Sequence, residues 1–221
     1  MPRYGFNFLW FFGKDDRRAT RAPDLGQLDL LREMGLDFVR IPCDYRIWTA
    51  GTRYAELDPD GLARIDAVLE ACRARGLHMN LNLHRAPGYC INGRDLETHN
   101  LWTDPAAQDG FVAQWEHFAR RYRSLDNEAI SFDLVNEPSG DEAEREGHEQ
   151  VIRRTVAAIR SIDPDREIVI DGWGGGHQPL PELADLDVIQ SGRGYQPFSL
   201  THYRAPWAAK IGTMEIPPPV Y

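Results

Sequence analysis

Cysteine is scarce in this sequence, and the few cysteines are spaced in a way that excludes two kinds of stabilising site. Cys43, Cys72 and Cys90 form no CxxC pair and no zinc-like pattern with histidine. We therefore expect neither a disulfide framework nor a structural metal site. A reducing compartment, the cytoplasm, is the simpler expectation, although secretion stays compatible with an N-terminus that was processed.

Long apolar runs are missing as well. A membrane-spanning helix needs about 20 consecutive apolar residues, and no run in the sequence approaches that length. The apolar start, residues 4–12, contains Gly5 and Asn7 and is followed by charged residues instead of a cleavage site with small residues. We therefore predict a buried first strand there, not a signal sequence, and expect no membrane partner.

Basic residues are outnumbered by acidic ones. The sequence has 25 lysines and arginines against 34 aspartates and glutamates, which gives a formal net charge of -9. A protein that neutralises a phosphate backbone needs a stripe of basic residues. Nucleic acid is therefore not expected as a partner.

Short apolar runs alternate with longer segments of helical period along the whole chain. Such β/α repetition is typical of a parallel sheet covered by helices. The predicted strands are residues 4–9, 38–41, 77–83, 130–135, 168–170 and 188–190, and the predicted helices are residues 24–34, 60–75, 105–123, 142–162 and 181–186. No linker divides the chain, so we expect residues 1–221 to form one domain.

The predicted fold class is α/β, of the (β/α)8 TIM-barrel type, truncated after the sixth strand. A TIM barrel typically has about 250 residues, and this chain has 221. Six strands in this order also fit a doubly wound open sheet. The alternation therefore supports the fold class, but closure of a barrel does not follow from it.

The fourth predicted strand ends in Asn136-Glu137-Pro138. This position places a carboxyl group at the C-terminal mouth of the strands, where barrel enzymes carry their catalytic groups. A carboxyl held there beside an amide can deliver a proton to a leaving oxygen near neutral pH. A simple turn is the alternative, because all three residue types suit the exit of a strand. Glu137 is our candidate for a general acid/base.

Two further strand ends carry polar groups. The second predicted strand places Arg40 among apolar residues, which is costly unless its guanidinium pairs with carboxylates; a surface arginine is the alternative. The third alternates asparagine and leucine up to His84. A lone histidine is more often structural, but the neighbouring polar groups favour contact with a ligand.

Three motifs together resemble a known family. The segments 40–42 (Arg-Ile-Pro), 82–88 (Asn-Leu-His-Arg-Ala-Pro-Gly) and 134–138 (Leu-Val-Asn-Glu-Pro) are similar to strands two, three and four of glycoside hydrolase family 5, the cellulase-like β-glycanases. Their order and spacing match, and the resemblance covers almost the whole chain.

The resemblance implies a retaining mechanism on a β-linked glycan. Glu137 would protonate the glycosidic oxygen and later activate water, Asn136 would bind the sugar 2-hydroxyl, and Arg40 and His84 would shape the site of the reacting sugar ring. A second carboxyl about 5 Å away would attack the anomeric carbon. No cofactor is implied, because carboxylates perform both steps.

The sixth-strand region can be aligned with the His-x-Tyr motif of this family. Tyr195 then takes the place of the tyrosine, and Arg193 stands where histidine is usual. The resemblance implies that Tyr195 hydrogen-bonds the nucleophile. A second alignment would use His202 and Tyr203, which are adjacent and fit the motif less well; we keep His202 as a candidate residue of a substrate-binding loop.

Aromatic side chains near the strand ends are candidates for stacking on the apolar faces of sugar rings. Most tryptophans serve only in packing, and Trp173, just after the fifth strand, is the best placed. The candidates are Trp10, Trp48, Tyr89, Trp102, Trp173 and Trp207.

The nucleophile implied by the resemblance has no match in the sequence. It belongs at the end of a seventh strand, whereas the only glutamate beyond Glu182 is Glu215, in the expected loop after strand six. Three explanations stay open: the natural chain continues past Tyr221, another chain supplies the last two units, or this is a relative without hydrolase activity. We favour the first. The first and sixth strands would be open edges, which favours self-association.

The leading interpretation is a retaining hydrolase of β-glucan-like polysaccharides or oligosaccharides. One alternative is a carbohydrate-binding pseudoenzyme or inactive fragment. Another, outside carbohydrate chemistry, is a barrel or doubly wound enzyme that uses Glu137 as a proton-transfer base.

Overall fold

The computed structural model describes residues 2–14 and 22–205. Six parallel strands form one curled sheet in the order β1-β2-β3-β5-β6-β7, and the short β4 pairs antiparallel with β3. The strands are β1 (Gly5–Asn7), β2 (Phe38–Asp44), β3 (His78–Ala86), β4 (Tyr89–Cys90), β5 (Ile130–Asp133), β6 (Ile168–Asp171) and β7 (Ile189–Ser191). Apart from β4, spatial order follows chain order, whereas a doubly wound sheet reverses direction at a switch point. The doubly wound alternative is therefore wrong, and the truncated barrel is confirmed.

Four long helices connect the strands, as predicted. They are α1 (Gly26–Glu33), α2 (Pro59–Arg73), α3 (Pro105–Tyr122) and α4 (Glu142–Ile162). Proline begins α2 and α3, where its missing N–H costs nothing, and the Asp58 carboxylate caps α2. Asp141 and Glu144 form a capping box at the start of α4. The helix expected at residues 181–186 is a 3-10 helix, η3 (Pro181–Leu186).

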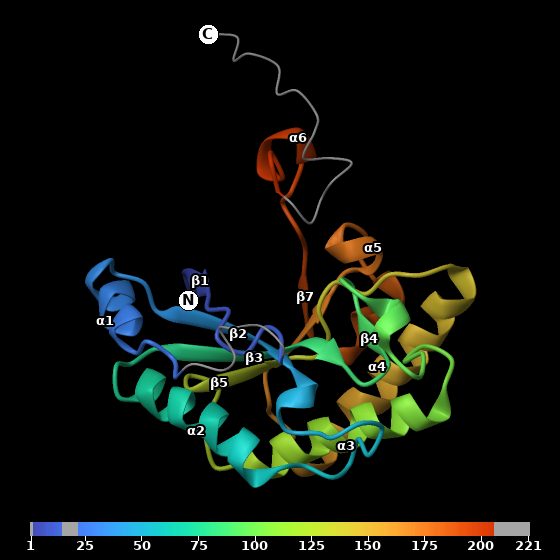
Figure 1. Cartoon of the computed structure of the whole chain (residues 1–221), viewed down its shortest axis with the longest axis horizontal. Coiled ribbons are helices and arrows are strands. Elements are labelled where there is room, and N and C mark those ends of the chain that lie inside the picture. The colour runs from blue at the N-terminus through green and yellow to red at the C-terminus, as the bar shows by residue number, and fades with distance from the viewer. Residues whose placement is uncertain (1, 15–21, 206–221) are drawn as a thin grey trace, which may run out of the picture.

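The loops contain shorter helical turns. These are η1 (Tyr45–Ile47), η2 (Arg94–Leu96), α5 (Trp173–Gly176) and α6 (Phe198–Thr201). Figure 1 shows α2 and α3 packed on one side of the sheet, while β7 leads into a segment that projects from the other side and carries α6. We call this segment, residues 192–205, the arm.

Side chains of opposite character line the two faces of the sheet, because successive residues of a strand point to opposite sides. Val39, Leu81 and Phe132 are buried against the helices. The inner face carries polar groups: His78 Nε2 lies 2.7 Å from Ser131 Oγ, which also accepts a bond of 2.9 Å from Asn80 Nδ2. Cross-strand hydrogen bonds therefore satisfy much of this polar interior.

The two edges of the described sheet expose large apolar side chains. Tyr4 and Phe6 at β1 are 64% and 56% exposed, and Ile189 on β7 is 50% exposed. The prediction that the first strand is buried is therefore wrong, because no described strand covers the outer side of β1. Within residues 2–14 and 22–205, no further strand pairs with β1 or β7 on the outer side. No helix in these ranges has the length and apolar character needed to cross a membrane.

His148 is a buried histidine of α4 that lies between two tryptophans. Its ring centroid is 5.1 Å from that of Trp102 and 5.2 Å from that of Trp173, and neither ring nitrogen has a hydrogen-bond partner. Burial lowers the pKa of His148 to about 3. The histidine is therefore neutral in the folded protein and gains its proton on unfolding.

This arrangement predicts a loss of stability in mild acid. Below the ordinary histidine pKa of about 6.5, His148 binds a proton in the unfolded chain but not in the folded protein. The free energy of unfolding therefore falls as the pH is lowered from about 6.5 toward 3. Between pH 7 and pH 5 the loss from this residue is about 2 kcal/mol. Urea unfolding of His148→Leu should show a pH dependence smaller by that amount, and His177→Leu, at an exposed position, serves as the control. An unchanged pH dependence in His148→Leu would contradict the assignment.

Candidate active site

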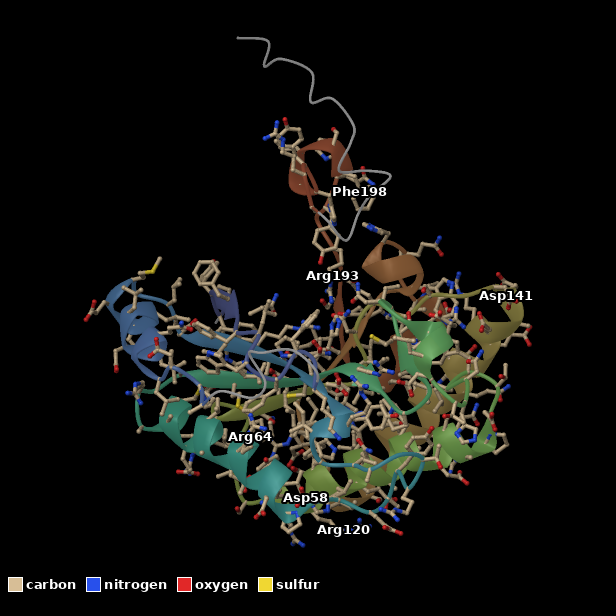
Figure 2. All side chains as sticks on the ribbon, in the orientation of Figure 1. Asp58, Arg64, Arg120, Asp141, Arg193 and Phe198 are labelled. Carbon is tan, nitrogen blue, oxygen red and sulfur yellow. The ribbon has the colours of Figure 1, made fainter. Side chains whose placement is uncertain are left out.

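The candidate site lies where the carboxyl ends of β2, β3, β5 and β6 meet the base of the arm. It contains Arg40, Asp133, Asn136, Glu137, Asp171 and Arg193, which contact one another. Figure 2 shows Arg193 at the base of the arm, just above the sheet, with Phe198 further out. The loop after β5 supplies Glu137, as the sequence predicted.

Glu137 is held through one carboxylate oxygen. Its Oε1 accepts hydrogen bonds of 2.9 Å from both Arg193 Nε and the Tyr195 hydroxyl. No described residue donates to Oε2, so this oxygen is left for a ligand. Burial raises the pKa of the Tyr195 phenol, and the Glu137 carboxylate raises it further, which keeps the phenol a donor.

The backbone of Glu137 is strained, and Asp171 secures it. Glu137 has a φ of +49°, in the left-handed region that a residue with a side chain rarely adopts. Its N–H donates to Asp171 Oδ2 over 2.8 Å, and the same oxygen accepts a bond from Arg193. Burial acts to lower the pKa of Arg193, but the carboxylates of Asp171 and Glu137 outweigh it and raise the pKa. Asp171 therefore fixes both the peptide of Glu137 and its ion-pair partner.

Arg40 links β2 to the end of β5 and to the loop that follows β5. Its Nε lies 2.7 Å from Asp133 Oδ2, and one terminal nitrogen lies 3.0 Å from Asn136 Oδ1. Arg193 reaches the same amide oxygen at 3.4 Å. Because two guanidinium groups hold the oxygen of Asn136, its N–H donors are turned away from them. The pairing of Arg40 with a carboxylate meets the condition for burying it.

His84 lies beside this cluster on β3. Its Nε2 is 2.9 Å from Asn92 Oδ1, and its ring centroid is 4.0 Å from that of Phe12. Burial lowers the pKa of His84 to about 4, so the ring is neutral near pH 7. A neutral imidazole can both donate and accept a hydrogen bond.

Comparison with known proteins decides the family. The model of the cellulase family, glycosyl hydrolase family 5, matches residues 18–195. The chain belongs to glycosyl hydrolase family 5. The resemblance seen in the three sequence motifs is therefore confirmed.

Two curated relatives show how much of a longer chain is represented. Endoglucanase C of Acetivibrio thermocellus is 35% identical over 185 residues, which are 82% of this chain and 52% of the relative. Cellodextrinase A of Ruminococcus flavefaciens is 30% identical over 82% of this chain and 54% of its own length. The chain thus spans about half the length of these relatives.

Solved structures agree on the fold. A crystal structure described as a glycoside hydrolase is 56% identical, with a TM-score of 0.89 over 94% of this chain and 65% of the other. Endoglucanase Cel5A from the hyperthermophilic Thermotoga maritima is 23% identical, with a TM-score of 0.75 over 94% of this chain and 66% of its own. The latter likeness is one of fold alone.

Two residues of the arm, Tyr195 and His202, were expected from the sequence to belong to the site, and their contacts differ from each other. Tyr195 reaches Glu137, whereas the family 5 resemblance implied a bond to the nucleophile. His202 contacts the rings of Tyr195 and Phe198, with centroids 5.2 Å and 5.0 Å away, and its Nδ1 lies 2.9 Å from the Thr201 hydroxyl. The described contacts of His202 are therefore on the arm. Its role in a substrate loop stays a prediction.

Trp173 is packed inside the protein. It is 5% exposed and lies against Trp102 and His148, with ring centroids 6.1 Å and 5.2 Å away. This packing does not favour the expected platform for a sugar ring. Trp207 and Glu215, also considered from the sequence, lie outside the described residues.

Asp133 and Asp171 belong to the site and were not singled out from the sequence. Each is the last residue of an apolar strand, in Ser131-Phe132-Asp133 and in the segment 168–171 (Ile-Val-Ile-Asp). The signal in the sequence that could have indicated these two residues is an aspartate at the end of a buried parallel strand, together with an arginine on another strand. The described residues contain no group of three or more His, Cys, Asp or Glu side chains that could hold a metal ion.

We expect the ion pair of Asp171 and Arg193 to stabilise the folded protein. Asp171→Ala removes a buried carboxylate, leaves the half-buried Arg193 guanidinium with fewer partners and releases the N–H of Glu137, which should lower the free energy of unfolding by about 3 kcal/mol. Urea unfolding measures this loss. Asp185→Ala, which breaks an exposed pair with Arg153, is the control and should behave like wild type. Equal effects in the two variants would contradict a special role for Asp171.

Proposed function

We propose that this chain carries the acid/base half of a retaining glycoside hydrolase that cleaves β-glycosidic bonds in β-glucan-like polysaccharides or oligosaccharides. The observation that carries the proposal is the state of Glu137: Oε1 is bound by Arg193 and Tyr195, and Oε2 accepts no bond from a described residue. The similarity to an endoglucanase and to a cellodextrinase supports this substrate class.

In this mechanism Oε2 of Glu137 delivers a proton to the glycosidic oxygen and later removes one from water. General acid/base catalysis of this kind contributes about 10²–10⁴-fold to a rate. Asn136, with its oxygen held by Arg40 and Arg193, offers N–H donors to the sugar 2-hydroxyl, a contact that strengthens in the transition state. Arg40 and neutral His84 shape the site of the reacting ring.

We propose that the second carboxylate of the mechanism, the nucleophile, comes from outside these 221 residues. Asp133 and Asp171 are buried and bound by arginines, so neither can approach an anomeric carbon. Retaining glycosidases hold their two carboxyls about 5 Å apart. A chain continued by two further β/α units is the source we favour.

A binding protein without hydrolytic activity is the second candidate. It is favoured by the same observation, because a site with one free carboxylate oxygen can bind a sugar without cleaving it. The two candidates differ in turnover and agree in glycan binding.

Hydrolysis of an aryl β-cellobioside separates these proposals. We expect no turnover by the 221-residue chain and measurable turnover by a chain extended through an eighth strand. Turnover by both would show that the nucleophile lies within these residues, and turnover by neither would favour the binding protein.

Within an active extended chain, Glu137→Gln should lower kcat by about 10²–10⁴-fold, because the amide cannot donate a carboxyl proton. Glu182→Gln is the matched control, since Glu182 is a half-buried partner of Arg145. Full activity in Glu137→Gln would remove the acid/base assignment.

We also propose that the 221-residue chain associates with itself through its open strand edges. Unpaired edge strands with exposed apolar side chains promote pairing between molecules, and Tyr4, Phe6 and Ile189 are such side chains.

Sedimentation velocity tests the association. Wild type should contain species larger than the monomer, and Phe6→Lys should shift the distribution toward the monomer, because a charge on an edge opposes pairing. Leu96→Lys changes an exposed leucine of η2 and should leave the distribution as in wild type. A monodisperse wild-type monomer would contradict the proposal.

A further inference from the structure

Among the described residues, three buried oxygen atoms on neighbouring strands of the inner face have no hydrogen-bond partner: Oδ1 of Asn82 on β3, Oδ1 of Asp133 on β5 and Oδ1 of Asp171 on β6. Asn82 and Asp133 are the pair that lies directly opposite across two strands. Asn82 is 0% exposed and Asp133 is 2% exposed. The strand register pairs these two residues, so their side chains lie side by side on the same face. The Asn82 amide nitrogen donates over 3.2 Å to the Asp133 main-chain oxygen.

The unpartnered oxygens of Asn82 and Asp133 can both accept hydrogen bonds, and neither can donate one while Asp133 is ionised. The oxygens of a carboxamide and of an ionised carboxylate both accept hydrogen bonds, so neither can satisfy the other. Buried acceptors without a donor are costly. A protonated carboxyl, by contrast, carries one O–H donor. One proton on Asp133 Oδ1 would therefore satisfy the unpartnered oxygens of Asn82 and Asp133.

The surrounding charges also favour a proton at this place. Each neighbouring element presents a charged or titratable group to the cluster: Arg40 from β2, neutral His84 from β3, Glu137 from the loop after β5, Asp171 from β6 and Arg193 from the arm. Two guanidinium groups thus face three carboxyl groups, which leaves one negative charge in excess if all three are ionised.

Among the three carboxyl groups, Asp133 has the fewest donors. Its side chain receives one bond, from Arg40 Nε to Oδ2. Asp171 receives Arg193 and the Glu137 N–H, and Glu137 receives Arg193 and Tyr195. Burial raises the pKa of Asp133 to about 6, with Arg40 opposing the shift and Asp171 adding to it.

We propose that, whenever Glu137 and Asp171 are both ionised, Asp133 is the carboxyl of this cluster that takes up a proton. Its Oδ1 takes up a proton from solvent, and the resulting O–H group donates a hydrogen bond to Asn82 Oδ1. The other oxygen, Oδ2, keeps its hydrogen bond from Arg40. Uptake cancels the excess negative charge and closes a hydrogen-bonded chain from Asn82 through Asp133 and Arg40 to Asn136. Asp133 is thus a positioning residue beneath the site. The proposal does not depend on hydrolytic activity.

Asp133→Asn tests the proposal because a carboxamide copies the protonated acid. Its oxygen can accept from Arg40, and its nitrogen can donate to Asn82 Oδ1. In wild type the folded pKa of Asp133, about 6, lies above the unfolded value of about 3.9. This group therefore contributes stability that is complete below pH 3.9 and is lost as pH rises through 6.

Urea unfolding across this window gives the first result. For this group, the unfolding equilibrium constant of wild type should rise about a hundredfold from below pH 4 to above pH 6, since two pKa units correspond to two powers of ten. The rise should be absent in Asp133→Asn. Identical pH profiles of the two proteins would overturn the proposal.

Infrared difference spectra give the second result and separate the proton from a bridging water. At about pH 5, midway in the window, the spectrum of wild type minus Asp133→Asn should contain the carbonyl stretch of a protonated carboxyl. Lack of that band means that Asp133 is ionised and that water bridges the two oxygens, which overturns the proposal.

Asn82→Leu keeps the test decisive if Asp133→Asn fails to fold. Removing the acceptor of the proposed hydrogen bond should shift the carboxyl band of Asp133 to the frequency of a free acid. The same substitution should also make the rise of the unfolding equilibrium constant with pH smaller than about a hundredfold. A band and a pH profile that do not change in Asn82→Leu would contradict the bond between Asp133 and Asn82.

Discussion

The ion-pair cluster of two buried aspartates, Asp133 and Asp171, with the half-buried Arg40 and Arg193 is the interaction on which the rest of the site depends. Burying a guanidinium or a carboxylate alone is costly, whereas a paired and hydrogen-bonded set can be tolerated. The cluster joins β2, β5, β6 and the base of the arm. It therefore fixes the relative positions of strand ends that are far apart in the sequence, and Glu137 is bound directly to it.

This cluster exists because the sheet has two different faces. The outer face packs apolar side chains against the helices, while the inner face holds asparagine, serine, histidine and aspartate linked across the strands. Most buried polar groups in proteins have a hydrogen-bond partner. Asp171 accepts the main-chain N–H of Glu137, whose backbone is left-handed, and Arg40 and Arg193 donate to the amide oxygen of Asn136.

Much of this could be predicted from the sequence, and the failures have physical reasons. Period and capping residues predicted the long helices, and the strand-end motif predicted where Glu137 lies. The packing of Trp173 could not be predicted, because a place in a loop after a strand says nothing about the aromatic side chains that bury it. Asp133 and Asp171 were missed because their meaning comes from arginines on other strands, a relation that only the folded sheet shows.

In the proposed function, Arg193 binds Oε1 of Glu137 and so holds this residue in position to donate a proton from Oε2. Leaving-group dependence in an active extended chain tests it most directly, with kcat/KM of Arg193→Met measured on two aryl β-cellobiosides. Turnover of the phenyl glycoside, which needs protonation, should fall by about 10²-fold or more, and turnover of the dinitrophenyl glycoside, which does not, should change little. Equal losses on both substrates would contradict the account.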